Sequence, residues 1–599
     1  MCRSMRVDMA PYRQYFPRTF ISKLQKPRRL VRRRKLLMVM IFVLIRAVAV
    51  AQEPAPQADV TVRVDKIFEK WNRTDSPGCA LSVMKDGRIV YEHGYGMAEV
   101  DHDITIKPST VFHVASISKQ FTAASIVLLD QQGKLSIDDD VRKYIPELPN
   151  FGTRITLRNL IHHTSGLRDQ WGLLGLAGRR YSLDLITDDD VMSVITRQKE
   201  LNLKPGEKYV YSNTDYTLLA LIVKRVSGMS FREYTTRNIF DPLGMKNTHF
   251  RDDHGEVVKN EAYGYTPQKD GRFRLSVTNF DTVGATGLQT TVEDLARWDE
   301  NFYHPLVGGV DFTSQMLQRG KLNNGEQIDY AFGLFMDKYK GLPTVDHSGA
   351  DAGYRADLTR FPEQHFSVAV LCNASDADPT GLVRKVADIY LATEIKATGM
   401  QPVIVTPSAD VASVEPTAPQ LSGFVGLYWN RDDDQFVNVY MKEGRLDVSF
   451  GGDNNFVLKP VGASDFHLAD VSFGDDVDVK FEPAAQDKPR RLLQSFDEGK
   501  PIVYESVEAF TPSVAGLSEY AGQYTSEEID PVYRVIIQDG KLAITRPKFK
   551  PAVLEPQVRD VFSGPFGTVR FTRNEQGQIS GFLIDDGRII NFRSTRRNQ

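Results

Sequence analysis

Cysteine is scarce in this chain, with three residues among 599. So few cysteines exclude the disulfide scaffold on which many small secreted domains depend. Cys79 and Cys372 are the two that lie beyond residue 51, so the chain after that point can form one disulfide at most. An apolar content of 41% and a charged content of 25% fit a globular protein, and the length predicts several domains.

Long hydrophobic runs are also lacking. Leu36–Ile45 is a run of ten apolar residues that ends at Arg46, which is too short to span a bilayer comfortably. The basic segment Lys26–Lys35 precedes this run, and the small residues AVAVA follow it and end at Ala51. This order is typical of a secretory signal, so we expect residues 1–51 to be a leader and the mature protein to be periplasmic or extracellular. An uncleaved anchor or a basic amphipathic arm is the alternative.

The chain has no strong net charge, because its formal value of −3 averages two unlike parts. The first 51 residues carry a net charge of +12, and the remaining residues carry −15. An acidic mature chain disfavours polyanionic partners, and no glycine-rich phosphate loop is present, so nucleic-acid binding is not expected. The mature chain is expected to lack an integral membrane span. The length of the basic region leaves open a translation start downstream of Met1.

Residues 59–397 read as one α/β body. A hairpin comes first, several helices follow, and strands return at the end, which predicts an antiparallel sheet that pairs the first and last segments around a helical insertion. The predicted strands are Cys79–Met84, Ile89–Tyr91, Thr344–His347, Arg355–Phe361 and Phe366–Cys372. The predicted helices are Phe121–Leu129, Asn213–Val226, Val292–Trp298 and Asp378–Thr393.

An internal repeat follows the α/β body. Residues 398–418 contain several prolines and little periodicity, so they are predicted to be a linker. LSGFVGLY, from Leu421, recurs 96 residues later as LSEYAGQY, from Leu517. Both copies contain short alternating strands that are separated by Gly or Asp turns. We therefore predict two similar β-barrel or sandwich modules, at residues 419–510 and 515–599.

Three short motifs point to nucleophilic catalysis. In the first, SISK, Ser116 and Lys119 lie three residues apart at the start of a predicted helix, so Lys119 can accept the proton of the serine. Ser82 and Lys85 have the same spacing, but they lie in a predicted strand, where an odd spacing sends the two side chains to opposite faces. Only Ser116 therefore has the context of an activated nucleophile.

The second and third motifs are YSN, which starts at Tyr211, and HSG, which starts at His347. Tyr211 can shuttle a proton, and the amide of Asn213 can hold a substrate carbonyl. Gly349 lets a substrate approach the edge of a strand closely, and the next backbone N–H, that of Ala350, can complete an oxyanion hole.

SISK, YSN and HSG in this order resemble the serine β-lactamase-related superfamily. Its relevant branch holds class C β-lactamases, D-alanyl-D-alanine carboxypeptidases, D-aminopeptidases and related esterases. The resemblance covers about residues 60–395. It implies the β-lactamase-like transpeptidase fold, in which a five-stranded antiparallel sheet packs against a helical domain. The C-terminal modules resemble the eight-stranded, lipocalin-like barrels that are attached to some D-aminopeptidases.

The resemblance also assigns roles to residues. It implies that Ser116 is the nucleophile, that Lys119 and Tyr211 transfer protons, and that Asn213 and His347 lie near the substrate. The N–H groups of Ser116 and Ala350 would form the oxyanion hole, with Gly349 beside the substrate. The same fold would place Cys79 and Cys372 in adjacent strands, where we expect buried thiols rather than a disulfide.

His347 departs from the pattern of many β-lactamases, which have a lysine at this position. Histidine is mostly neutral at pH 7, so it does not provide the permanent cation that holds a substrate carboxylate. This favours hydrolysis of small peptides or amides that contain D-amino acids, or of esters. A true β-lactamase and a penicillin-recognising sensor without turnover remain the alternatives.

Other residues are weaker candidates. His162 and His163 are adjacent and there is no H-E-x-x-H motif, so neither a metal nor a cofactor is expected. We expect one of them to pack under the following turn and the other to be exposed. Trp171 either walls the active site or anchors packing. The expected partner is a small-molecule or short-peptide substrate, and the oligomeric state stays open.

Overall fold

The predicted leader and most of the predicted linker lie outside the part of the chain that the structure describes. In the described part, no helix combines the length and the hydropathy needed to cross a bilayer. Residues from Val60 onward form one unit that holds the sheet, the helices and both barrels. The computed structural model describes residues 55–398, 416–451, 455–469, 477–485, 488–496 and 501–597.

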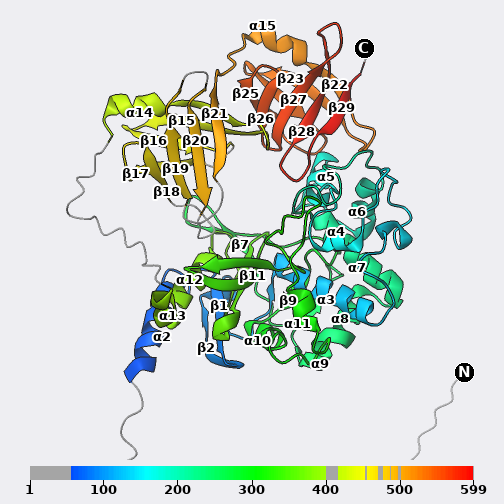
Figure 1. Cartoon of the computed structure of the whole chain (residues 1–599), viewed down its shortest axis with the longest axis vertical. Coiled ribbons are helices and arrows are strands. Elements are labelled where there is room, and N and C mark those ends of the chain that lie inside the picture. The colour runs from blue at the N-terminus through cyan, green and yellow to red at the C-terminus, as the bar shows by residue number, and fades with distance from the viewer. Residues whose placement is uncertain are drawn as a thin grey trace, which may run out of the picture. The chain divides into compact units, whose positions relative to one another are not determined.

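The central sheet has six antiparallel strands, one more than expected (Figure 1). The first and last predicted segments pair with each other, as β1 with β13. The additional strand, β10, lies at one edge, and its side chains are half-buried or exposed, so it lacks a clear apolar pattern. In spatial order the strands are β10 (Phe335–Tyr339), β11 (Leu342–Asp351), β12 (Tyr354–Phe361), β13 (Phe366–Cys372), β1 (Cys79–Lys85) and β2 (Arg88–Tyr95).

The pairing of β1 with β13 corrects the expectation for the two cysteines. Cys79 lies directly opposite Cys372, their Cα atoms are 4.0 Å apart, and the two sulfur atoms form a disulfide. The expectation of free thiols was wrong because the two cysteines lie directly opposite each other. The Cα atoms of such a pair can approach more closely than the average spacing between adjacent strands. The bond joins β1 and β13, the first and last strands of this sheet in chain order, across a sequence separation of 293.

Four helices begin within a few residues of their predicted starts. Gly228, at φ +72°, ends the second of them, and the side chain of Thr291 caps the third by accepting from the backbone N–H of Asp294. These helices are α3 (Ser118–Gln131), α7 (Asn213–Ser227), α10 (Val292–Glu300) and α12 (Pro379–Tyr390).

Shorter elements complete the body. The further helices are α2 (Ala55–Ile67), α4 (Leu157–Ile161), α5 (Gln170–Leu176), α6 (Asp188–Ile195), α8 (Phe231–Thr235), α9 (Asp241–Leu243), α11 (Phe312–Met316) and α13 (Ala392–Ala397). Small sheets are made by β3 (Met97–Glu99) with β4 (Ile104–Thr105), by β5 (Phe112–His113), β9 (Leu288–Thr290) and β6 (His249–Phe250), and by β7 (Tyr265–Pro267) with β8 (Phe273–Leu275).

The repeat forms two closed eight-stranded barrels, which Figure 1 colours from yellow to red. Helix α14 (Ala418–Phe424) precedes the first barrel and α15 (Val514–Leu517) the second. The first contains β14 (Gly426–Asn430), β15 (Gln435–Lys442), β16 (Arg445–Ser449), β17 (Asn455–Pro460), β18 (Asp465–Ala469), β19 (Val477–Glu482), β20 (Arg491–Phe496) and β21 (Ile502–Val507). The second contains β22 (Gly522–Thr525), β23 (Val532–Gln538), β24 (Lys541–Thr545), β25 (Ala552–Val558), β26 (Val561–Gly564), β27 (Gly567–Arg573), β28 (Ile579–Asp585) and β29 (Phe592–Arg596).

The barrels bury equivalent residues but differ in their surroundings. Tyr428 and Tyr524, which are related by the 96-residue offset, are both fully buried. The first barrel has an apolar cluster of its own, whereas the buried residues of the second barrel are continuous with those of the α/β body. The hydroxyl of Tyr533 in β23 donates to the backbone carbonyl of Leu176 in α5 at 2.8 Å. The second barrel is therefore packed onto the body through its own core side chains.

Candidate active site

Ser116 lies in a single 3₁₀ turn, Ala115–Ile117, that leads directly into α3. Ala115 has φ +46°, a left-handed backbone conformation that costs an L-residue energy and is retained where the surroundings enforce it. Ser118 fixes the turn, since its Oγ donates to the carbonyl of Ala115 at 2.5 Å and accepts from the backbone N–H of Leu288 at 3.1 Å. The turn presents Ser116 at the start of a buried helix.

Lys119 lies one turn along α3 and is fully buried. Its Nζ lies 3.0 Å from Ser116 Oγ, 2.9 Å from Asn213 Oδ1 and 2.8 Å from the carbonyl oxygen of Ala285. Burial lowers the pKa of Lys119 well below its usual range, because the charged form loses its hydration. When the amine is neutral, it can donate two of these bonds to Asn213 and Ala285, and its lone pair then faces the hydroxyl of Ser116. The geometry suits proton removal from the serine.

Tyr211 approaches Ser116 from the residues before α7. Its hydroxyl donates to Ser116 Oγ at 2.9 Å, and Lys119 Nζ lies 4.8 Å from the centre of its ring. Burial raises the pKa of Tyr211, so the phenol keeps its proton at neutral pH. The serine oxygen thus contacts the desolvated amine of Lys119 on one side and a proton-bearing phenol on the other, and both lie within proton-transfer distance.

Asn213 begins α7 and connects Lys119 to a residue that the sequence analysis missed. Its backbone N–H and its Nδ2 both donate to Asp169 Oδ2, at 2.7 and 2.8 Å. The other oxygen of Asp169 accepts from the backbone N–H of Trp171 at 2.9 Å and caps α5. Asp169 is therefore a positioning residue for Asn213. In the sequence it carries only the signal of a helix cap, which is common.

Strand β11 passes against the nucleophile turn at Gly349. A Cβ atom built at Gly349 would lie 2.2 Å from the carbonyl oxygen of Val114 and 3.2 Å from the backbone nitrogen of Ser116. Only glycine allows this approach. The strand continues to Asp351, beyond the end predicted at His347. Ala350 follows Gly349 directly in β11, and its oxyanion role stays a prediction.

His347 is buried beside the site as a neutral imidazole. Its Nδ1 donates to the carbonyl of Ser348 at 2.6 Å, and its Nε2 lies 3.2 Å from the hydroxyl of Tyr330. Burial lowers the pKa of His347 to about 3, and the proximity of Lys119 acts in the same direction. His347 therefore supplies no positive charge to the site at neutral pH.

A loop of the second barrel reaches the same site, an arrangement that the resemblance to D-aminopeptidases implies, although the sequence did not identify which loop or residue. This loop, residues 586–591, joins β28 to β29. The guanidinium of Arg588 lies 4.8 Å from the centre of the Tyr211 ring. The carbonyl of Arg588 accepts from the backbone N–H of Asp169 at 3.2 Å and from Asn202 Nδ2 at 2.8 Å. The sequence gives no local signal for this contact, because the two segments meet only in the folded chain.

A buried ion pair holds the loop region in place. Arg168 Nη1 donates to both carboxylate oxygens of Glu528, at 3.0 and 2.9 Å, and both side chains are almost fully buried. Arg168 Nη2 also donates to the carbonyls of Ile590 and Asn591, at 3.2 and 3.3 Å. Charge-assisted contacts of this kind fix geometry strongly when both partners are present.

A comparison with protein families supports this assignment of the active site. The family model described as beta-lactamase matches residues 64–392, which include the nucleophile turn, Lys119, Tyr211 and β11. This chain belongs to the beta-lactamase family. Members of the family are serine hydrolases with the transpeptidase-like fold, so the predicted fold class and resemblance are confirmed.

Individual relatives resemble this chain over different parts of its length. Penicillin-binding protein 4* of Bacillus subtilis (strain 168) is 30% identical over 435 residues, which cover 69% of this chain and 92% of that protein. D-aminopeptidase of Gluconobacter oxydans (strain 621H) is 30% identical over 318 residues, or 51% and 57% of the two chains. The solved octameric penicillin-binding protein homologue from Pyrococcus abyssi is 25% identical, with a TM-score of 0.53 over 75% of this chain and all of that one.

Both adjacent histidines are buried, which corrects the expectation that one would be exposed. His162 Nδ1 and Nε2 contact the carbonyls of Arg158 and Gln318. His163 has φ +53°, and its ring lies among tyrosines, 4.4 Å from that of Tyr211 between ring centres. The left-handed backbone at His163 accompanies the burial of its ring, and this conformation cannot be read from the sequence.

Trp171 is half-buried and packs on aromatic neighbours. Its ring centre lies 4.8 Å from that of Tyr181 and 5.6 Å from that of Phe280. The hydroxyl of Tyr181 donates to Asp351, the last residue of β11. Trp171 therefore packs within the aromatic cluster beside the end of the catalytic strand.

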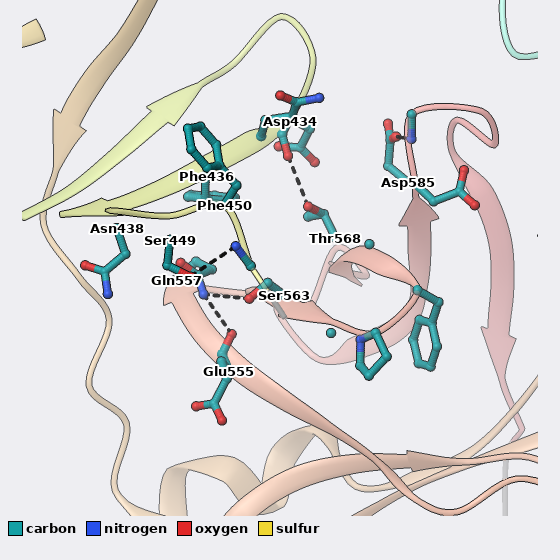
Figure 2. Close-up of a pocket in the computed structure, with 18 of the residues that line it drawn as sticks. Asp434, Phe436, Asn438, Ser449, Phe450, Glu555, Gln557, Ser563, Thr568 and Asp585 are labelled. Atoms are coloured by element: carbon teal, nitrogen blue, oxygen red, sulfur yellow. Dashed lines mark hydrogen bonds between the residues drawn. The ribbon is translucent and has the colours of Figure 1, made fainter. Parts of the chain in front are cut away.

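A separate hollow of about 930 Å³ lies between the two barrels (Figure 2). The first barrel contributes Phe436 and Phe450, and the second contributes Gln557 and Thr568. Thr568 Oγ1 donates to the carbonyl of Asp434 at 3.0 Å. Residues 585–587 also line the hollow, and they lie directly before Arg588.

Proposed function

We propose that this protein is an exported serine hydrolase that forms an acyl-enzyme on Ser116. The observation that carries the proposal is the environment of Ser116 Oγ, which lies 3.0 Å from Lys119 Nζ and 2.9 Å from the hydroxyl of Tyr211. A serine between a desolvated amine and a protonated phenol has both the base and the acid that acyl transfer needs.

In the proposed reaction, Ser116 Oγ attacks a carbonyl carbon while Lys119 accepts the hydroxyl proton. The N–H groups of Ser116 and Ala350 stabilise the oxyanion of the tetrahedral intermediate. Collapse of the intermediate breaks the bond to the leaving group, which receives a proton through Tyr211. Water then attacks the ester, the same groups activate it, and the acid product leaves with the serine restored.

The proposed substrates are short peptides or amides that contain D-amino acids, or small esters. The neutral state of His347 supports this choice, because the third motif offers no permanent cation like the lysine of many β-lactamases. The barrel loop at Arg588 supports small substrates, since it comes close to Tyr211. One relative bears the name D-aminopeptidase and another the name penicillin-binding protein.

Two observations support export. The first 51 residues have the order of basic, apolar and small residues that secretory signals share. The disulfide between Cys79 and Cys372 suits an oxidising compartment outside the cytoplasm.

The test is a turnover panel of D- and L-aminoacyl amides, D-Ala-D-Ala peptides, p-nitrophenyl esters and a chromogenic cephalosporin. Steady hydrolysis of amides, peptides or esters that Ser116→Ala abolishes supports the proposal. Preferential turnover of the cephalosporin favours a true β-lactamase, and a burst without a steady state favours a penicillin-recognising sensor. Unchanged turnover in Ser116→Ala contradicts the proposal.

A further inference from the structure

Among the described residues, the guanidinium of Arg588 forms no hydrogen bond or close ion pair. It lies over the Tyr211 ring, the nearby carboxylate of Asp586 interacts with its charge, and Arg588 is exposed. A single aromatic ring separates this charge from the hydroxyl that donates to Ser116 Oγ. An unpaired arginine beside a nucleophile is available to a bound molecule.

The other charged groups near Ser116 are already engaged by the protein. Asp169 accepts hydrogen bonds from Trp171 and Asn213. Asp351 accepts from Thr286 Oγ1 at 3.0 Å and from the hydroxyl of Tyr181, and it lies 3.0 Å from His113 Nε2. His347 is neutral, and Lys119 is buried and committed to Ser116. Arg588 is therefore the group that can attract an anion on the substrate.

The backbone around Arg588 is held by several hydrogen bonds, so the loop that carries this side chain is fixed at the site. Asp586 Oδ1 accepts from the backbone N–H groups of Arg588 and Ile589, at 2.9 and 2.6 Å. Asn202 clamps the loop from the α/β body, because its Nδ2 donates to the carbonyl of Arg588 and its Oδ1 accepts from the N–H of Ile590 at 2.7 Å. Because the loop is already ordered, ligand binding has to order only the side chain of Arg588.

We propose that Arg588 binds a carboxylate of the substrate close to the scissile bond, so that peptides with a free terminal carboxylate are preferred over their amides. Arg588 then supplies from the second barrel the positive charge that neutral His347 does not supply from β11. The planar guanidinium matches a carboxylate with two parallel hydrogen bonds. This inference rests on the proposed hydrolase function, because it concerns substrate choice at the same serine.

The test uses protection of Ser116 from a fluorophosphonate by two ligands that differ in one group, N-acetyl-D-alanine and N-acetyl-D-alaninamide. Wild-type protein should be protected by the carboxylate at a concentration about 10- to 100-fold lower than by the amide. Arg588→Gln should remove this preference, and Arg588→Lys should keep part of it. Arg593→Gln, an exposed arginine of β29 on the same barrel, is the matched control and should behave as wild type.

The ratio of kcat/KM for a D-Ala-D-Ala peptide to that for its terminal amide should fall by a similar factor in Arg588→Gln. Equal protection by the two ligands in wild type, or no protection by either, would overturn the inference. An acid-to-amide ratio that Arg588→Gln leaves unchanged would do the same. Absence of fluorophosphonate labelling at Ser116 would instead contradict the hydrolase function itself, so the two failures are distinguishable.

Discussion

The ability of Lys119 to act as a base for Ser116 depends on the surroundings of its amine. A lysine in water is protonated and cannot act as a base at neutral pH. In this site burial removes its hydration, and two fixed acceptors, Asn213 Oδ1 and the carbonyl of Ala285, leave its lone pair for the serine. Sequence spacing predicts the pair, but the desolvation that makes it reactive depends on the whole helical domain.

Replacing Arg588 should shift the pH profile. The positive charge of Arg588 lowers the pKa of Lys119, as burial does, whereas Asp169, Asp351 and Asp215 raise it. The base must be unprotonated to act, so Arg588→Gln raises the pKa of Lys119 and moves the acidic limb of kcat/KM to higher pH. The measurement is the pH dependence of turnover of an uncharged ester, with Arg588→Lys as the charge-conserving control. An acidic limb that stays in place contradicts this electrostatic role.

At the residue scale, the motifs reveal only what is local. Ser116 and Lys119 follow from helical spacing, and Tyr211 from a short motif before a helix. Asp169 resembles an ordinary helix cap, and Arg588 lies in a turn between two barrel strands, so their role depends on contacts between distant segments. The expectation that either His162 or His163 would be exposed was wrong, and the left-handed backbone of His163 is not visible in the sequence.

At the scale of elements, β11 lies tightly against the nucleophile turn at Gly349. Gly349→Ala should lower kcat/KM by about 100-fold, because the new Cβ would meet the backbone of Val114 and push the strand away from Ser116. Gly423→Ala in α14 is the matched control, since a Cβ there meets nothing within 4 Å. Steady-state kinetics and thermal unfolding measure both variants. Wild-type kinetics in Gly349→Ala would show that the strand need not lie so close.

The ion pair between Arg168 and Glu528 should stabilise the junction of the body with the second barrel. Glu528→Gln leaves a buried arginine without its counter-charge and should cost about 3 kcal/mol of unfolding free energy. Asp530→Asn breaks the neighbouring pair with Arg197, whose side chains are far more exposed, and should cost less than about 1 kcal/mol. Urea unfolding followed by tryptophan fluorescence compares the two. Equal losses of unfolding free energy in the two variants would contradict a stabilising role of the buried ion pair.

The elements themselves were largely predictable, for reasons that differ among them. Helix α7 has a clear apolar period and a terminal glycine, so its bounds Asn213–Ser227 lie within a residue of the prediction. Strand β13, Phe366–Cys372, is apolar apart from Ser367 and was predicted at its full length. Strand β10 was missed because an edge strand with half-exposed side chains has no distinctive pattern.

At the scale of the whole molecule, the disulfide joins the first and last strands of the body. Reduction, or the double change Cys79→Ala and Cys372→Ala, should lower the free energy of unfolding by about 2–4 kcal/mol, since the bond restricts the unfolded chain. Calorimetry with and without a thiol reductant measures the change. Protein that begins at residue 52 should show no titratable thiol until it is reduced. Two free thiols in the native protein would contradict the bond.

The division of the chain into a body and two repeated modules was visible in the sequence, because the repeat and the motif order need no tertiary knowledge. The difference in packing between the two barrels was not visible in the sequence. The second barrel shares its buried cluster with the body and sends Arg588 to the active site, while the first keeps a core of its own. That difference depends on contacts such as the buried ion pair of Arg168 with Glu528, whose pairing across the fold has no signature in the sequence.

Covalent labelling of the nucleophile tests the central claim most directly. The mature protein is treated with a fluorophosphonate, digested, and mapped by mass spectrometry. We predict one label, on Ser116, at a rate that falls by at least about 100-fold in Lys119→Met and that vanishes in Ser116→Ala. A label on another residue, or no label in wild-type protein that is folded, would contradict the account.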